Sequence, residues 1–431
     1  MKHANIIEKL NLEQKCALLS GDTVFTTRAL PKAGIPSVTL SDGPNGVRKQ
    51  AGAADHLGLN PSVPATCFPT AATVACSWDP ALGEEIGRAM GEEAAAQEVA
   101  VLLGPGLNTK RSPLCGRNFE YFSEDPYLSG KMAAAYVRGI QSEGIAACPK
   151  HFAVNSQELR RMASDSVLDE RTLRELYLTG FEIVVKEAAP KTIMSSYNLV
   201  NGQHMTENRD LAVGVLRERW GFEGIFMSDW DATYSVAGPV NNGLDLEMPG
   251  ARYTNPENLQ KLLAAGVVTE ETIDAKCLHI LQTLIAFGFL DREQKDASIP
   301  ERNPESDATA LEVARNSMVL LKNDGLLPFG RRTRRVVVLG PNAVKLPMGG
   351  GSGEGSPFEY VSVAEGLAAE KGLRVECLTP RGTTALAASG RFFTPDGEPG
   401  LRCEFYANRD LQGLSVVTTT HPEVDFFWEG A

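Results

Sequence analysis

The chain has 431 residues, and 43% of them are apolar, which is enough to build large cores in about two to three domains. Its formal net charge is −12 with acidic and basic residues interspersed, which argues against a nucleic-acid partner. No run of about 18 apolar residues is present, so the sequence predicts no membrane span.

The N-terminal residues MKHANIIEKLNLEQK lack the apolar run of a secretion signal and favour an amphipathic helix. Eight cysteines are scattered along the chain without a C-x-x-C pair or zinc-like spacing. In a chain of this length without a signal, we expect buried, reduced thiols and a cytoplasmic location. We predict no metal site and no cofactor.

Seven short apolar runs predict strands, and most of them end in a polar cluster. The runs lie at 37–40, 73–76, 99–103, 145–148, 192–195, 225–228 and 245–248. The stretches 80–97, 127–144 and 169–188 between them are typical of helices. Continuous apolar strands separated by helices predict parallel strands buried on both faces. These seven units predict an α/β protein with a TIM-like (β/α) barrel, one unit short of the usual eight.

After the predicted barrel of residues 1–290, a polar stretch predicts a linker over 291–310. Residues 311–388 alternate helix and strand patterns, which predicts the N-terminal part of an α/β sandwich domain. Residues 389–431 are rich in strand and turn formers and predict the start of a β-rich module. Because the chain stops within this pattern, we expect it to be part of a longer protein.

Within the α/β part, we expect helices near 308–318 and 360–371 and strands at 319–323, 335–343 and 373–378. The intervening loop MGGGSGEGSP lacks the glycine order of a nucleotide-binding loop. This loop favours a flexible linker or a site of close backbone approach.

Polar residues follow four of the predicted strands: Ser41-Asp42, Lys150-His151, Tyr197-Asn198 and Asp229. In (β/α) barrels, the catalytic groups lie at these C-terminal strand ends. The sequence therefore predicts an active site that gathers these side chains.

Asp229 admits two interpretations. It can cap a following helix, or it can be a nucleophilic or ligand-binding carboxylate at the barrel mouth. Its neighbour Trp230 offers an apolar face on which a sugar ring can stack. Lys150-His151 and Arg117 likewise suit either structural ion pairs or donors to ligand hydroxyls. Arg117 belongs to the charged and aromatic loop RSPLCGRNFEYFSEDP, which suits a packed binding loop as well as a surface loop.

At this point the motifs resemble glycoside hydrolase family 3 of the β-glucosidase type. The motifs that carry the resemblance are SDGPNGVR (41–48), GRNFEYFSEDP (116–126), KHFAVNSQELRR (150–161), MSSYNLVNG (194–202), GFEGIFMSDW (221–230), GLDLEMPG (243–250) and ARNSMVLLKNDGLLPF (314–329). The residues from 389 resemble the start of a protective-antigen-type β-sandwich module that some members carry.

The resemblance implies a retaining β-D-glucosidase that acts on terminal β-glucosyl residues of small or oligosaccharide substrates, with Asp229 as nucleophile. It implies that the innermost sugar is held by Asp42, Arg117, Lys150, His151, Arg161, Met194, Tyr197 and Trp230. Asp42 then accepts hydrogen bonds from the outer hydroxyls. Lys150, His151 and Arg117 donate them.

The acid/base residue is left unassigned. In this branch of the family it is a Glu late in the second domain, so the resemblance places it beyond Ala431. Glu354, in the glycine loop, is the one visible carboxylate after the barrel that we expect near the cleft, and it does not match the family's acid.

Three alternatives stay open. A β-xylosidase of the same family differs from a glucosidase by one hydroxymethyl group on the sugar. Lys150 at a strand end also suits a Schiff-base lyase or aldolase. A non-catalytic sugar-binding fragment is the third, because a nucleophile is visible without its acid. Linkage and aglycone preference and the oligomeric state are not predicted.

Overall fold

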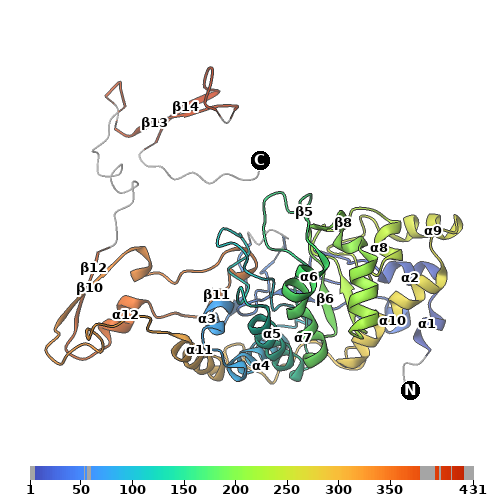
Figure 1. Ribbon diagram of the computed structural model, residues 1–431, viewed down its shortest axis with the longest axis horizontal. Helices are drawn as coiled ribbons and strands as arrows, with labels where there is room; N and C mark the ends of the chain where they lie inside the picture. The colour runs from blue at the N-terminus through green and yellow to red at the C-terminus, as the bar shows by residue number, and fades with distance from the viewer. Residues whose placement is uncertain are drawn as a thin grey trace. The chain divides into compact units, whose positions relative to one another are not determined.

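The computed structural model describes residues 5–52, 54–55, 60–378, 394–397, 399–408 and 410–421 (Figure 1). The chain divides into two compact units, Met1–Lys322 with Met348–Glu359 and Asn323–Pro347 with Tyr360–Ala431. The domain boundaries predicted at 290, 310 and 388 stay predictions.

The first unit contains the barrel. Its α-helices are α1 (Ile6–Lys9), α2 (Leu12–Leu18), α3 (Ala71–Ala75), α4 (Pro80–Ala96), α5 (Pro126–Ser142), α6 (Glu170–Thr172), α7 (Thr179–Ala188), α8 (Ala237–Asn241), α9 (Pro256–Ala264), α10 (Glu270–Ala286) and α11 (Pro304–Ser317). Two π-helical segments are η2 (Leu173–Leu178) and η4 (Asp210–Arg219). Its strands are β1 (Leu40–Asp42), β2 (Pro64–Ala65), β3 (Val101–Leu103), β4 (Ala146–Ala147), β5 (Asp165–Ser166), β6 (Thr192–Met194), β7 (Leu199–Val200), β8 (Gln203–His204), β9 (Ile225–Met227) and β11 (Ser356–Pro357).

Strand pairing runs around a ring. Strands β1, β3 and β4 pair in parallel, as do β6 and β9. Single parallel bridges extend the series, Phe152 with Ser195 and Met227 with Leu246. Residue 247 then pairs with residue 20, and the segment 20–27 turns back to pair with residue 39 beside β1. The predicted TIM-like barrel is confirmed, and the N-terminal segment closes it where a regular strand would stand.

The strand predicted at 73–76 is wrong, because these residues belong mainly to helix α3. The apolar residues that α3 buries are Ala71, Val74 and Ala75. Their spacing of three and four is helical, and Thr70 precedes them in extended conformation. The run TVAC matches a strand pattern only when it is read without the two alanines before it.

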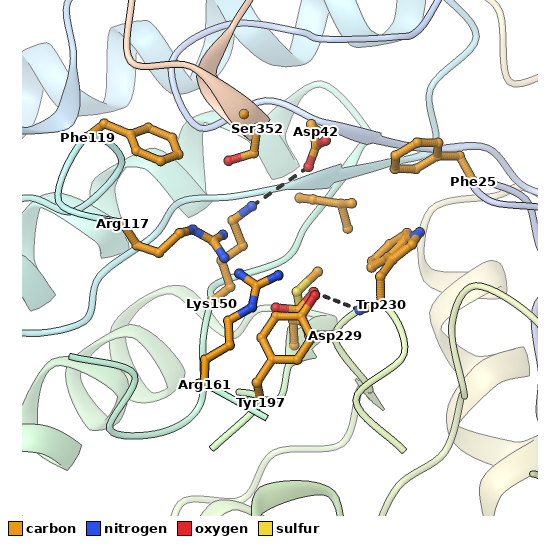
Figure 2. Close-up of a pocket in the computed structure, with 13 residues that line it drawn as sticks. Phe25, Asp42, Arg117, Phe119, Lys150, Arg161, Tyr197, Asp229, Trp230 and Ser352 are labelled. Atoms are coloured by element: carbon orange, nitrogen blue, oxygen red, sulfur yellow. Dashed lines mark hydrogen bonds and ion pairs between the residues drawn. The ribbon is translucent and has the colours of Figure 1, made fainter. Parts of the chain in front are cut away.

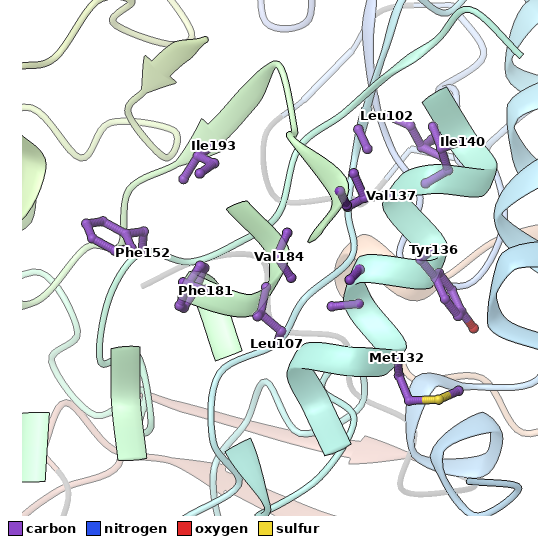
Figure 3. Close-up of a cluster of buried hydrophobic side chains, with 14 of the residues drawn as sticks. Leu102, Leu107, Met132, Tyr136, Val137, Ile140, Phe152, Phe181, Val184 and Ile193 are labelled. Atoms are coloured by element: carbon purple, nitrogen blue, oxygen red, sulfur yellow. The ribbon is translucent and has the colours of Figure 1, made fainter. Parts of the chain in front are cut away.

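The helices cover the ring and fill the space around it with a large hydrophobic cluster (Figure 3). Phe152, which follows β4, is fully buried and contacts the rings of Phe181, Trp220 and Phe226 edge-on. Helices α4 and α5 pack closely, because glycines stand where they cross. This packing fixes the strands whose C-terminal ends form the site.

The predicted linker also packs against the barrel unit. Gln294 accepts a hydrogen bond from the Thr39 amide and donates one to the Ser37 carbonyl. Arg292 donates to the Gly144 carbonyl. Both contacts lie at the N-terminal ends of strands β1 and β4, away from the site.

The second unit contains a parallel pair, β10 (Arg335–Leu339) and β12 (Arg374–Leu378), with helix α12 (Val363–Ala368). It also contains an antiparallel pair, β13 (Leu401–Phe405) and β14 (Val417–His421). The α/β part and the β-rich part predicted after the linker are both present. Residues 379–393 and 422–431 of the prediction lie outside the described residues.

The strand predicted at 319–323 is wrong, since these residues are irregular. Leu320 and Leu321 are largely exposed. A strand needs a neighbour for its backbone groups, and within the described residues this segment pairs with none. In the described part of the chain, no helix is long and apolar enough to cross a membrane.

Candidate active site

A cavity of about 170 Å³ lies at the C-terminal ends of the barrel strands (Figure 2). It is lined by Phe25, Asp42, Leu103, Arg117, Phe119, Lys150, Arg161, Met194, Tyr197, Asp229, Trp230, Gly351 and Ser352. Eight of the nine residues predicted for the site from the sequence are among them, and the ninth, His151, is not. Figure 2 shows the cationic side chains converging between Phe119 on one side and Phe25 with Trp230 on the other.

Asp229 lies just beyond the end of β9, and its side chain is 9% exposed. Its Oδ1 accepts a hydrogen bond of 2.7 Å from the Trp230 amide. Its Oδ2 is buried and accepts no hydrogen bond from any residue that the structure describes. No helix begins within the three residues after Asp229, so the helix-cap interpretation fails. One carboxylate oxygen is thus anchored, and the other is left free.

The charge on Asp229 is balanced by cations. Burial raises the pKa of Asp229, and the charges of Arg117, Lys150 and Arg161 hold back part of that rise. An ionised carboxylate in such a position is poorly solvated and lies close to positive charge. These are the conditions in which a carboxylate serves as a nucleophile.

A buried ion cluster forms the floor of the cavity. Glu120 is fully buried and bonds the Arg117 guanidinium through Oε1. Its Oε2 lies 3.2 Å from the Lys150 ammonium. Burial alone would raise the pKa of Glu120, but the charges of Arg117 and Lys150 lower it below its usual value. Glu120 therefore stays ionised and fixes two cations that face the cavity.

Asp42, at the end of β1, is the second carboxylate on the wall of the cavity. Its oxygens lie 3.9 Å from Lys150 Nζ and 4.0 Å from the Arg48 guanidinium. Burial raises its pKa, and the charges of Lys150 and Arg48 oppose that rise. Both contacts are too long for a hydrogen bond, so Asp42 has lone pairs available for a ligand.

Arg161 and Tyr197 form one corner of the cavity. The guanidinium carbon of Arg161 lies 4.0 Å above the centre of the Tyr197 ring, and the group also donates to Glu158 at 2.9 Å. Burial raises the pKa of Tyr197 well above its usual value, so its hydroxyl stays protonated. The stacking orients the remaining Arg161 donors.

Trp230 forms the opposite wall. Its indole nitrogen donates to the Val24 carbonyl at 2.7 Å, and its ring lies 5.4 Å from that of Phe25. The N-terminal segment that closes the barrel thus also supplies an aromatic side chain to the site. Sequence reasoning missed Phe25, because no motif or strand end marks it.

His151 is not among the side chains that line the cavity, although its Nε2 lies 3.4 Å from Asp229 Oδ2, and its predicted role as a donor to the sugar stays a prediction. It is fully buried, and its ring nitrogens contact Arg117 at 2.8 Å and Tyr121 at 2.9 Å. The side chain therefore contacts Arg117 and Asp229, which line the cavity.

The glycine loop approaches the barrel at close range. A Cβ at Gly349 or Gly353 would lie 2.8 Å or 3.1 Å from the Phe119 side chain. Ser352 lines the cavity and donates to Glu120 Oε2 at 3.0 Å. Of the two interpretations of this loop, the structure supports close backbone approach. The sequence signal for Ser352 and Phe119 was only their position within the glycine loop and the aromatic loop.

Glu354 does not line the cavity. Its side chain is exposed and accepts a hydrogen bond from the Gly350 amide at 3.0 Å. The carboxylates that line the cavity, among the described residues, are Asp42 and Asp229. No group of three or more His, Cys, Asp or Glu side chains in the described ranges could hold a metal ion.

This is a barrel with a buried carboxylate and a cationic floor at its C-terminal mouth. Residues 53–283 match the glycosyl hydrolase family 3 N terminal domain, and residues 318–397 match the glycosyl hydrolase family 3 C-terminal domain. The chain belongs to glycosyl hydrolase family 3.

The chain is also similar to curated proteins and to solved structures that are named beta-glucosidases. The chain is 44% identical to thermostable beta-glucosidase B of Acetivibrio thermocellus over 81% of the chain and 45% of that protein. It is 39% identical to a beta-glucosidase of Rhizobium radiobacter over 98% of the chain and 51% of that protein. Beta-glucosidase 3B of Thermotoga neapolitana, solved with glycerol, matches with a TM-score of 0.81 and 36% identity, covering 87% of the chain and 55% of that structure. The structure of the Kluyveromyces marxianus beta-glucosidase in complex with glucose matches with a TM-score of 0.81 and 34% identity. The match covers 98% of the chain and 52% of that structure. The chain spans about half the length of these relatives.

Proposed function

We propose that the chain carries the glycone site and the nucleophile of a retaining β-D-glucosidase. The observation that carries the proposal is Asp229, whose Oδ1 is anchored to the Trp230 amide while its buried Oδ2 accepts no hydrogen bond from the described residues. A retaining glycosidase needs such an oxygen to attack the anomeric carbon. The attack forms a glycosyl–Asp229 ester as the bond to the leaving oxygen breaks, and water later hydrolyses that ester.

The surrounding groups suit a sugar ring. Asp42 offers acceptors to ring hydroxyls, and the Arg117 and Lys150 cations offer donors. Trp230 presents an aromatic face beside Asp229. We assign Arg161, Met194 and Tyr197 to the same subsite, because they line the same cavity.

Glucose is the proposed glycone. The relatives from Acetivibrio thermocellus and Rhizobium radiobacter are named beta-glucosidases, and the Kluyveromyces marxianus structure contains glucose. These names favour a β-glucosidase over a β-xylosidase for this chain. The substrate is then a small or oligosaccharide β-glucoside, and a cytoplasmic location is part of the proposal.

The acid/base residue stays unassigned. A retaining glycosidase needs a second carboxyl group about 5–5.5 Å from the nucleophile to protonate the leaving group. Asp42 is assigned to the ring hydroxyls, and Glu354 is exposed and does not line the cavity. With an activated leaving group, such as dinitrophenolate, the attack by Asp229 needs no proton donor.

A Schiff-base lyase is disfavoured. An imine-forming lysine needs apolar surroundings or a cationic neighbour. Lys150 instead faces the carboxylates of Glu120 and Asp42. The ammonium is therefore held as an ion-pair partner.

The test is to trap the ester. Incubation with 2,4-dinitrophenyl 2-deoxy-2-fluoro-β-glucoside is expected to release one dinitrophenolate per chain and to add one fluoroglucosyl group to the peptide that contains Asp229. Peptide mass spectrometry locates the group, and the corresponding xyloside separates the two glycones by rate. Labelling of any other residue overturns the assignment, and labelling of Lys150 after borohydride treatment with a carbonyl compound would support the lyase.

A further inference from the structure

Three lysine side chains are buried among the described residues, and one of them lacks a counter-ion. The three are Lys15, Lys150 and Lys276, which are 7%, 2% and 4% exposed. The first two each lie within ion-pair distance of two carboxylates. Lys276, on helix α10, forms no ion pair and no hydrogen bond with any residue that the structure describes. A buried ammonium without a partner is poorly solvated, so the position favours the neutral amine.

The buried carboxylate that acts on Lys276 is Asp245, and other donors already occupy it. Its Oδ1 contacts His279 Nδ1 at 2.9 Å, and its Oδ2 accepts from the Arg217 guanidinium and from the Phe226 amide. Arg217 thus neutralises Asp245 and adds a second cation to the surroundings of Lys276. Burial and the charge of Arg217 lower the pKa of Lys276 to about 8, although the charge of Asp245 opposes that shift.

The amine can be reached through a cavity beside α10. The cavity has a volume of about 330 Å³, and Lys276 lines it together with polar side chains. Those that offer donors or acceptors to hydroxyl groups include Asn241, Glu271, Thr272 and His279. The cavity therefore suits a small hydroxylated molecule better than an alkyl chain.

This cavity lies at the end of the barrel opposite to Asp229. Arg217, which lines it, donates to the carbonyls of Phe222 and Gly224, and both precede strand β9. Asp229 follows the same strand. Lys276 is therefore separate from the proposed glycoside site.

A desolvated lysine beside a cation is the setting in which an amine attacks a carbonyl carbon. Lys150 faces carboxylates instead, whereas Lys276 is both buried and close to Arg217. In the reaction with an aldehyde, the amine nitrogen bonds to the carbonyl carbon, and the carbonyl oxygen leaves as water with the two amine protons. His279, one turn after Lys276 on α10, lines the same cavity and can transfer these protons.

We propose that Lys276 is a covalent attachment site for short-chain hydroxyaldehydes, which bind in this cavity as an imine of the lysine amine. Water is the only by-product, so the reaction needs no oxidant or reductant. The site does not depend on the proposed glycosidase activity, because it shares no residue with the cavity around Asp229.

The experiment traps the imine in the full chain. The protein is incubated with glyceraldehyde and cyanoborohydride at about pH 7.5, and peptide mass spectrometry follows the initial rate of labelling at each lysine. Lys15 is the matched control, because it is buried to a similar extent but paired with two carboxylates. Exposed Lys295 reports the reaction of a solvated amine. The label should be absent from Lys276→Met at this position.

Lys276 is expected to react at least about tenfold faster than Lys15 and Lys295, because a larger share of its amine is neutral at that pH. Its labelling rate should saturate with glyceraldehyde concentration, because the aldehyde binds in the cavity before it reacts. Propionaldehyde has the same number of carbons and no hydroxyl group. Its half-saturating concentration should be at least about tenfold higher, the effect of one hydrogen bond.

The proposal is overturned if Lys276 reacts no faster than Lys15 or Lys295. It is also overturned if labelling of Lys276 rises without saturation, or if both aldehydes half-saturate it at the same concentration. If Lys276→Met does not fold, the peptide map of the wild-type chain alone decides.

Discussion

The Lys150 ammonium lies 3.2 Å from Glu120 Oε2, and the two side chains are 2% and 0% exposed. Glu120 bonds Arg117 with its other oxygen. One buried carboxylate therefore holds two cations in place at the floor of the cavity. The cost of burying these charges is offset only while all three are present.

Replacing Glu120 by Gln should destabilise the fold strongly. Two buried cations would lose their counter-ion, which costs about 3–5 kcal/mol in comparable pairs. Denaturant unfolding measures the change. The control is Glu187→Gln, whose ion pair with Lys131 is largely solvated and should be worth at most about 1 kcal/mol. Similar small changes in the free energy of unfolding of both variants would show that the two buried cations do not depend on Glu120 as their counter-ion.

The destabilisation by Glu120→Gln should depend on pH. The folded-state pKa of Glu120 is lowered, so the ionised group contributes stability above the unfolded pKa of about 4.3. That contribution is lost as the pH falls through the folded-state pKa. The difference between wild type and variant should therefore be largest near pH 7 and shrink in acid. A difference that is constant down to pH 2 would contradict the ionic explanation.

Asp229→Asn should abolish ester formation without weakening the fold. Loss of the nucleophile is expected to lower the trapping rate by roughly 10⁴-fold or more. Because burial raises the folded-state pKa of Asp229, the folded state binds this proton more tightly than the unfolded state does. Ionised Asp229 thus destabilises the fold near neutral pH, and the variant should melt at an equal or higher temperature. That gain should vanish below the ordinary Asp pKa of about 3.9. A large drop in melting temperature would instead indicate a structural role.

The rule that parallel strands end at one rim predicted much of the site. Asp42, Lys150, Tyr197 and Asp229 each follow or end a strand, and one cavity gathers them. The rule predicts which residues lie at the rim of the barrel, but it does not predict the direction of their side chains. His151, next to Lys150, follows the same strand end, yet it is not among the side chains that line the cavity.

Other parts of the site depend on contacts between distant segments. Phe25 reaches the cavity because the N-terminal segment closes the ring, and Ser352 reaches it from a loop far along the chain. Neither position carries a periodic or motif signal. In the sequence, Glu120 belongs to the charged and aromatic loop that contains Arg117, and only the structure shows that its partners are Arg117 and Lys150.

The crossing of α4 and α5 provides a test of the packing that supports the strands. A Cβ at Gly139 would lie 2.2 Å from the Glu84 carbonyl oxygen and 2.6 Å from the Arg88 nitrogen, both backbone atoms of α4. Gly139→Ala must push the helices apart, which should cost about 1–3 kcal/mol or more. Gly214 on the helical segment η4 is the matched control, because no described atom lies within 4 Å of its Cβ position. Gly214→Ala should be neutral or stabilise the fold by up to about 1 kcal/mol through helix propensity. Denaturant midpoints compare the two, and equal stabilities would mean that α4 and α5 do not approach as closely as described.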